Sequence, residues 1–202
     1  MSARLVSMAV AYAMGSGTLR CKGVKQRPWL ELKRLETERT YMLHQVRSLQ
    51  RAGAGPVRAA VDMLPGRHFY DVCRARLQHD AFERAIELLA PEGEISLSKE
   101  VLEVGGGRGL ASIWLDLGHW DRGTAVIPLS SEPNADALLS HLIGRGVTGI
   151  GKGGNPTTLR LSKRQFAQFS GLIRHHVHRS MAHALREGSK HGTSIMRVAT
   201  LV

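Results

Sequence analysis

The spacing of apolar residues changes along the chain and predicts a mixture of helices and strands. Residues that recur every three or four positions predict amphipathic helices over about 29–51, 57–63, 81–90, 110–117, 134–143, and onward from the Ser162–Gln165 capping box. Short apolar or alternating runs predict strands at 95–97, 101–104, 124–129 and 158–161. The first two of these strands are expected to form a hairpin. No internal repeat is visible in this order of elements.

The first apolar run, from Leu5 to Met14, follows a single arginine and precedes the first acidic residue, Glu31. It is shorter than the roughly 18 consecutive apolar residues of a transmembrane helix. A buried strand or helix is the favoured interpretation. A mitochondrial transit peptide within residues 1–30 stays open as an alternative, because such peptides also lack acidic residues.

Together these elements predict an α/β (α+β) fold with one small sheet. We expect a basic, mainly helical N-terminal arm (1–56), an α/β core domain (57–150) and a basic helical C-terminal arm (151–202). Two cysteines, Cys21 and Cys73, are too few for a disulfide scaffold and favour a reducing compartment. The expected location is therefore the cytoplasm, and no membrane partner is expected.

The positive charge is concentrated at the two ends of the chain. The formal net charge is +11, and residues 1–50 hold nine Lys/Arg against three acids. Residues 151–202 hold nine against one, whereas residues 51–150 hold ten against thirteen. Because phosphate contacts supply most sequence-independent affinity for nucleic acid, this distribution favours a nucleic-acid partner, DNA ahead of RNA. The alternatives are a solubilising surface and a non-enzymatic ribonucleoprotein or interaction component.

Basic side chains of the C-terminal part are the candidate contacts to nucleic acid: Lys152, Arg160, Lys163, Arg164, Arg179 and Arg186. The last long helix also contains four histidines: His175, His176, His178 and His183. A basic helix face is favoured over a zinc site there, because the further ligands that zinc needs are absent. The apolar stripe of the 29–51 helix is a candidate surface for a protein partner.

The most specific motif is a glycine cluster, Gly105, Gly106, Gly107 and Gly109, which surrounds Arg108. It follows the apolar run 101–104 and precedes the predicted helix 110–117, with Gly118 expected as a left-handed cap. Glycines allow a ligand to approach the backbone, and the start of a helix favours an anion. The cluster is therefore the candidate phosphate-binding site, with a tight turn and no ligand as the alternative.

The order helix, hairpin, Gly-x-x-Arg, helix and short strand over 81–129 resembles the ParB/sulfiredoxin-like fold. This fold occurs in plasmid partition proteins, sulfiredoxin, and some plasmid-borne nucleases and fertility-inhibition factors. The resemblance implies that Arg108 binds a phosphate and that Gly105 provides the close backbone approach. It also implies a plasmid- or phage-type accessory factor with nuclease or nucleotide-hydrolysing (ATPase) activity. Arg108 and Glu103 are then the candidate catalytic residues, and a nucleotide with a divalent metal is the candidate cofactor.

A weaker resemblance is to class I S-adenosylmethionine methyltransferases. Their acid-x-Gly-x-Gly-x-Gly motif is similar to Glu103, Gly105, Gly107 and Gly109. The acid that binds the ribose after the family's second strand has no counterpart near Ile127 and Pro128. A methyltransferase that uses S-adenosylmethionine is therefore the alternative enzyme.

Overall fold

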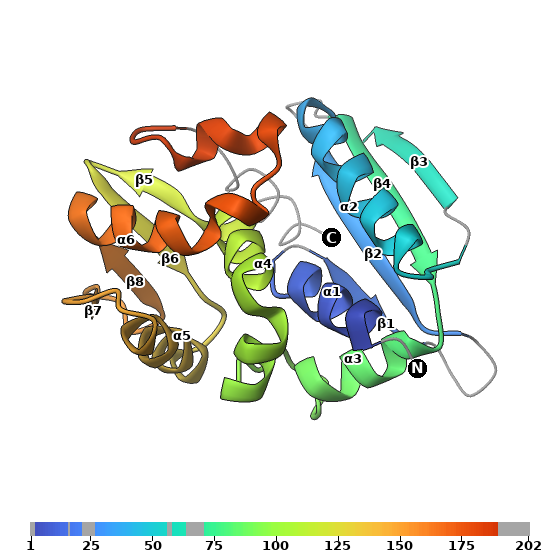
Figure 1. Ribbon diagram of the computed structural model, residues 1–202, viewed down its shortest axis with the longest axis horizontal. Coiled ribbons are helices and arrows are strands. Elements are labelled where there is room, and N and C mark those ends of the chain that lie inside the picture. The colour runs from blue at the N-terminus through green and yellow to red at the C-terminus, as the bar shows by residue number, and fades with distance from the viewer. Residues whose placement is uncertain (1–2, 16, 22–26, 56–57, 64–70, 190–202) are drawn as a thin grey trace.

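The computed structural model describes residues 3–15, 17–21, 27–55, 58–63 and 71–189 and shows the same order of elements twice (Figure 1). Each repeat runs helix, hairpin, helix, hairpin, helix. The first consists of α1 (Ala3–Ala13), β1 (Thr18–Arg20), β2 (Trp29–Leu35), η1 (Glu36–Glu38), α2 (Arg39–Arg51), β3 (Arg58–Met63), β4 (Asp71–Gln78) and α3 (Ala81–Leu89). The second consists of α4 (Lys99–Leu117), β5 (His119–Asp121), β6 (Thr124–Pro128), α5 (Glu132–Gly144), β7 (Gly151–Lys152), β8 (Thr158–Leu161) and α6 (Lys163–Ile173). Two 3-10 turns follow, η2 (Arg174–His176) and η3 (Arg179–Leu185).

Each repeat builds one antiparallel sheet, and the two sheets have the same strand order. Sheet A is ordered β1-β2-β4-β3 and sheet B is ordered β5-β6-β8-β7. Two small antiparallel sheets with helices packed on them confirm the predicted α+β class, although two sheets are present where one was predicted. The repeat itself was not visible in the sequence, because the two copies share topology and differ in residues.

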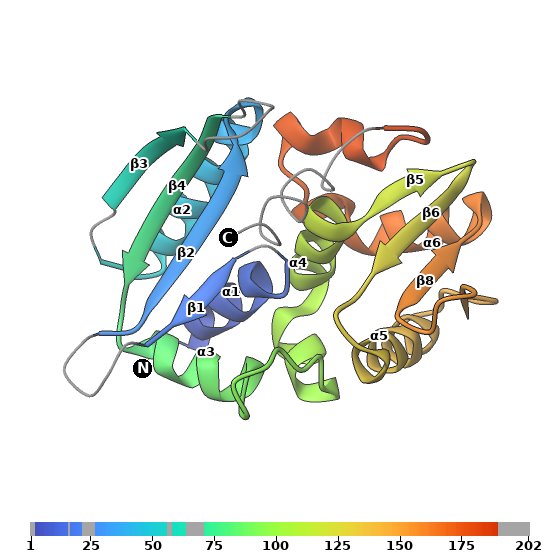
Figure 2. The same cartoon turned by 180° about the vertical axis from the view of Figure 1, so that it is seen from behind.

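The sheets lie on one side of the molecule and most helices lie on the other (Figures 1 and 2). Alternation along the strands produces this layering, since successive side chains of a strand point to opposite faces. In sheet A, Leu30 and Leu32 are buried in the core together with Ala75 and Leu77 of the paired strand. In sheet B the core side chains are Ala125, Ile127, Leu159 and Leu161.

The two repeats meet where α1 packs along α4. The helices run in the same direction, since Ser7 bonds the carbonyl of Val104 at 2.7 Å and Gly15 lies beside Ser112 further along. Gly105 and Gly109 allow this approach, because a Cβ on Gly109 would lie 2.6 Å from Met14 Sδ. The predicted buried segment Leu5–Met14 is therefore confirmed as a buried helix. Among the described helices, none is both long and apolar enough to cross a membrane.

Several local predictions are wrong, and each error has a physical cause. The predicted 29–51 helix is strand β2 followed by helix α2. The side chains of Trp29–Leu35 alternate between the two faces of a strand, but the spacing of the leucines in this segment also fits a helix, and this caused the error. The predicted helix 57–63 is strand β3. The predicted strand 101–104 belongs to α4, whose helix begins at the Ser98 cap. Gly118 has φ −69° and ψ 150°, so it is not a left-handed cap.

Other local predictions are confirmed. The helices predicted at 81–90 and 110–117 correspond to α3 and the last part of α4, and the strands at 124–129 and 158–161 correspond to β6 and β8. Ser162 and Gln165 form the predicted capping box at the start of α6. That helix ends at Ile173, so the single long C-terminal helix is instead a helix followed by two 3-10 turns.

The predicted domain boundaries at residues 56 and 150 both fall inside a sheet. Strand β2 precedes residue 56 and pairs with β4 after it, while β6 precedes residue 150 and pairs with β8 after it. The structure therefore consists of two successive repeats, about 3–89 and 99–173, and not of a core with two arms. The apolar stripe of α2 is also covered, because Tyr41, Met42, Val46 and Leu49 are buried in the core.

Candidate nucleic-acid interface

The outer face of sheet A collects basic side chains from three strands. Its described members from β1, β2 and β4 include four cations and one acid: Arg20, Lys33, Arg74, Arg76 and Glu31. Most of these residues pair with one another across the strands, and along each strand all of them alternate with the core residues. Because successive side chains of a strand point to opposite faces, they all lie on the outer face. The result is an excess of positive charge, among the described side chains, on a β-sheet surface that none of the described helices covers (Figure 2).

Glu31 organises the centre of this face. Its carboxylate bonds Arg76 at 2.9 Å and pairs with Lys33 at 3.2 Å. Burial alone would raise the pKa of Glu31, but the bonds from Arg76 and Lys33 outweigh it and hold the pKa below its usual value. The Arg76 guanidinium also stacks on the Trp29 ring at 5.1 Å from the centroid. These contacts hold the cations in fixed positions.

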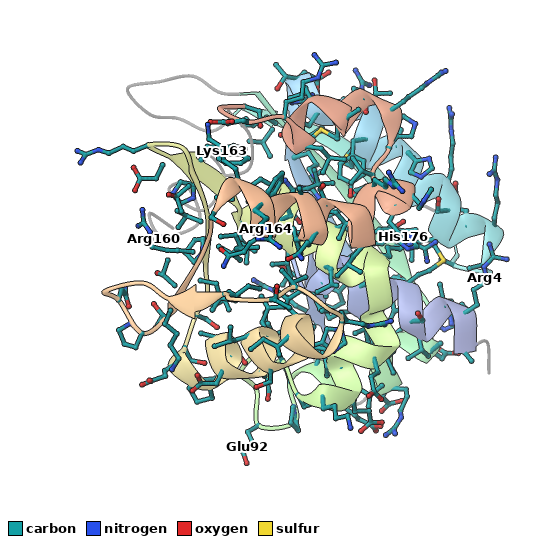
Figure 3. The ribbon with its side chains drawn as sticks, turned by 60° about the vertical axis from the view of Figure 1, so that its left-hand side comes forward. Arg4, Glu92, Arg160, Lys163, Arg164 and His176 are labelled. Atoms are coloured by element: carbon teal, nitrogen blue, oxygen red, sulfur yellow. The ribbon has the colours of Figure 1, made fainter. Side chains whose placement is uncertain are left out.

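The outer face of sheet B is nearly neutral by comparison. Arg160 of β8 lies there and pairs with Asp121 of β5 at 3.0 Å. Their neighbours on the face include Thr124, Val126 and Thr158. Of the six cations predicted to contact nucleic acid, Arg160 is the one that the structure places on an outer sheet face (Figure 3).

The remaining predicted contacts lie elsewhere. Lys152 pairs with Glu132 at 2.8 Å and with Asp136 at 2.5 Å, and Lys163 pairs with Glu187 at 2.7 Å. These carboxylates compete with a phosphate for the two lysines. The other three arginines are exposed on α6, on η3 and just after it, and not on a strand of either sheet: Arg164, Arg179 and Arg186. The structure therefore does not gather the six into one surface.

The predicted glycine site has a different shape from the expected strand-to-helix turn. Gly106 has φ 53° and ψ −152°, which places a kink inside α4. Gly105 and Gly109 face α1, and a Cβ on Gly107 would lie 2.6 Å from the His176 ring. The glycines thus permit close packing between helices. That role explains the cluster without a ligand at Gly105 or Gly109.

The two predicted catalytic residues are not brought together. Glu103 is exposed on the surface of α4 and lies 3.9 Å from Lys99. Arg108 is half-buried on the same helix, where its charge acts on Tyr12, His44 and His176. The structure shows no contact between Glu103 and Arg108.

Four functional candidates were missed in the sequence: Arg20, Lys33, Arg74 and Arg76. Arg74 and Arg76 alternate with the apolar residues Cys73, Ala75 and Leu77, which is the period of a strand with one buried face. That alternation predicts β4, and the strand would have placed both arginines on one exposed face.

A buried ion pair lies where the two repeats join. Arg34 of β2 bonds Asp116 of α4, with the two side chains 2% and 0% exposed, and Glu38 lies 3.9 Å from the same guanidinium. Burial would lower the pKa of Arg34, but the charge of Asp116 outweighs it and raises the pKa. Gly15 leaves the space for this carboxylate, since a Cβ there would collide with Asp116. The pair connects sheet A to the helix of the second repeat.

No family model and no curated protein matches the sequence. The homing endonuclease I-WcaI, in a structure bound to its DNA recognition sequence, is 15% identical with a TM-score of 0.72, over 92% of this chain and 87% of that one. A structure from a study of mesophilic variants of the homing endonuclease I-DmoI is 12% identical, with a TM-score of 0.53. The match covers 85% of this chain and 96% of that one. The fold of this chain is therefore similar to the folds of these two solved homing endonucleases.

This fold overturns both resemblances inferred from the glycine motif. A ParB/sulfiredoxin-like unit and a methyltransferase each need a strand before the glycines, and residues 101–104 are helical. The two antiparallel sheets also differ from the parallel sheet of a doubly wound methyltransferase. The plasmid or phage role, the ATPase activity and the S-adenosylmethionine cofactor followed from those resemblances and lose their basis with them.

Proposed function

We propose that this protein binds duplex DNA through the outer faces of its two sheets, with sheet A supplying most of the electrostatic attraction. The observation that supports this best is the basic face of sheet A, where the described side chains of β1, β2 and β4 include Arg20, Lys33, Arg74 and Arg76 together with Glu31. The structure of I-WcaI, which has a similar fold, is described as bound to its DNA recognition sequence.

The chemistry of these faces suits a duplex. The major groove of B-DNA admits β-strands, and several proteins read DNA with them. Lysine and arginine neutralise phosphates and release counterions, while guanidinium groups also bond guanine edges. The two sheets face the same side of the molecule, so one duplex can contact both (Figure 2).

A charge-matched pair of variants tests this function. One variant changes Arg20, Lys33 and Arg74 to alanine and leaves the Arg76–Glu31 bond in place. The control changes Arg4, Arg84 and Lys99, which lie on α1, α3 and α4, and removes the same charge. Each lost phosphate contact reduces the slope of log K against log salt by about 0.9, so the first variant should lose about 3 from the slope. The control should keep the wild-type slope in fluorescence anisotropy, and equal slopes for both variants would contradict the proposal.

DNA strand cleavage is the second candidate function, because both neighbours are described as endonucleases. Nucleases that use metal ions hold them with carboxylates next to the scissile phosphate. The described carboxylates where α1 and α4 end do not fit such a site, since Asp116 is buried against Arg34. In the first repeat, the sequence 14–28 contains no Asp or Glu. We therefore place DNA binding ahead of cleavage.

A plasmid assay separates the two functions. Supercoiled plasmid is incubated with the protein at low salt, with and without Mg²⁺, and binding is measured on the same samples. Retained binding with intact plasmid supports a DNA-binding protein. Nicking that depends on Mg²⁺ and survives Asp116→Asn would place cleavage first and would require carboxylates other than those near Arg34.

A further inference from the structure

Arg76 of β4 is held in one position on the outer face of sheet A, whose two central strands are β2 and β4 (Figure 2). It lies across from Glu31 of β2, and its Nη2 donates to Glu31 Oε2 at 2.9 Å. Its guanidinium also lies over the Trp29 ring, with Cζ 5.1 Å from the ring centroid. Because Trp29 and Glu31 are two residues apart on one strand, they share this face and contact Arg76 together.

The two partners of Arg76 are themselves fixed. Trp29 is 6% exposed and Glu31 is 8% exposed, so packing leaves each side chain few alternative rotamers. Glu31 is further held by Lys33, whose ammonium lies 3.2 Å from the other carboxylate oxygen, Oε1. Arg76 therefore loses little conformational entropy when it binds a ligand, because the protein has already ordered it.

The guanidinium of Arg76 retains donors for a ligand. An arginine carries five N–H donors in a planar arrangement, and the contacts of Arg76 with the described residues use one of them, at Glu31. The Arg76 side chain is 42% exposed, so a ligand on the sheet face can reach it. The result is a planar group of hydrogen-bond donors that is both accessible and fixed.

Two other cations of this face differ from Arg76. Arg20 is exposed on β1, an edge strand, and has no ion pair with any described residue. Lys33 also pairs with Glu31, but its ammonium is a compact charge without planar donors. Such cations suit phosphates, which occur along every duplex and carry no sequence information. A base edge presents acceptors at fixed positions, so it is recognised best by donors that are themselves fixed.

We propose that Arg76 bonds the edge of a guanine in the major groove of the bound duplex, and that Trp29 and Glu31 position it. The free donors of its guanidinium would reach O6 and N7, the pair of acceptors that distinguishes guanine and that arginine contacts most often. Arg20 and Lys33 would contact phosphates. This division rests on the proposed binding of duplex DNA by sheet A and goes beyond it, because it predicts a preference for one base pair.

The experiment first selects bound duplexes from a randomised library with the full chain and then measures the selected sequence by fluorescence anisotropy. Each guanine of that sequence is replaced in turn by 7-deazaguanine, which retains base pairing and lacks the N7 acceptor. One replacement should weaken binding to the wild-type protein about tenfold, as for the loss of a hydrogen bond to a charged group. Arg76→Lys keeps the charge and loses the planar donors, so it should bind both duplexes equally.

Arg20→Lys is the matched control, because it makes the same change on the same face. It should retain the tenfold discrimination between guanine and 7-deazaguanine. The salt dependence separates the two roles further. Arg20→Ala should reduce the slope of log K against log salt by about 0.9, whereas Arg76→Lys should keep the wild-type slope while it loses the discrimination.

Two positions test the positioning role. Glu31→Gln removes a negative charge from the face, so it should tighten binding to any duplex and at the same time lower the discrimination several-fold. A residue that only supports the fold would not produce these opposite effects. Asp121→Asn removes a carboxylate from the face of sheet B and should leave the discrimination unchanged. Trp29→Phe keeps an aromatic ring beside Arg76 and should retain the discrimination, which Trp29→Leu should lose; circular dichroism checks that both variants fold.

Three results would overturn the proposal. They are selected duplexes without a preferred guanine, equal sensitivity of the wild type and Arg76→Lys to every 7-deazaguanine, or a loss of discrimination in Arg20→Lys as large as in Arg76→Lys. Salt-dependent binding without sequence preference would refute this inference and leave the proposed DNA binding intact. A wild-type protein that binds no duplex would refute both.

Discussion

The two repeats have the same topology, but the outer face of sheet A is basic and that of sheet B is nearly neutral. The outer face of sheet A presents four described cations around Glu31, whereas that of sheet B presents Arg160 neutralised by Asp121. Their hairpins differ too: residues 21–28 connect β1 and β2 and include three basic residues, while Arg122–Gly123 alone connect β5 and β6. The comparison teaches that the shared fold sets where a ligand can bind, and that the side chains on alternate strand positions decide how strongly.

The helices, unlike the outer sheet faces, have matching roles in the two repeats. Both repeats contribute equally to the central pair α1 and α4, and the buried Arg34–Asp116 pair joins one repeat to the other. The repeats therefore differ on their outer faces but form one structural unit through their helices. Three predictions test this division, beginning with the contact that joins the repeats.

Arg34→Ala should cause the largest loss, about 3–5 kcal/mol of unfolding free energy, because it leaves Asp116 buried without its partner. The measurement is urea denaturation followed by circular dichroism. Arg39→Ala is the matched control, since Arg39 pairs with Glu36 at the surface and should contribute less than about 1 kcal/mol. Similar losses in the two variants would show that the pair does not hold the repeats together.

Gly109→Ala should destabilise the protein by about 1–3 kcal/mol, because the added methyl group would press on Met14 where α1 and α4 meet. Gly171→Ala is the same change in α6, where nothing lies within 4 Å of the added Cβ. There we expect a gain of about 0.4–1 kcal/mol from helix propensity and reduced freedom of the unfolded chain. Opposite signs of the change in melting temperature check this prediction, and equal signs would refute close packing at the helix pair.

Asp121→Asn should have the smallest effect of the three changes, and it directly reduces the charge difference between the outer faces of the two sheets. It releases Arg160 from its ion pair, so sheet B gains a cation that can contact a phosphate. The salt slope for duplex DNA should then steepen by up to about 0.9. Arg160→Ala in the wild-type background should change the slope by less than Arg74→Ala does. If Arg160→Ala has the larger effect, sheet B is the main DNA-binding face.

Local patterns predicted those elements in which one periodicity dominates. The helix α3, the strands β6 and β8 and the Ser162–Gln165 capping box follow directly from apolar spacing and capping chemistry. The segment 29–51 contains both a strand and a helix, and its leucines fit a helical period across the boundary between them. The apolar run 101–104 is equally ambiguous, because a short buried helix segment and a buried strand have the same composition.

The sequence pointed to some of the candidate cations but not to the set on sheet A, because that set forms only when distant strands pair. Arg108 was singled out as the arginine of the glycine cluster, and Arg160 as one of six basic residues of the C-terminal part, where the charge distribution concentrates cations. Lys33, Arg74 and Arg76 come from strands that are far apart in sequence and adjacent in space, so only strand pairing collects them. Lys152 and Lys163 were included for their charge, and only the fold showed that Glu132 and Glu187 neutralise them.

The sequence by itself determined the α+β class, the net positive charge, several helices and strands, and an arginine within a glycine-rich segment. These depend on residue type and on spacing over a few positions. Only the tertiary structure decided that the chain is two repeats, that the glycines pack helices, and that basic residues from distant strands share the outer face of sheet A. Those features depend on which distant strands and helices come together, and that is decided by the burial of many side chains at once.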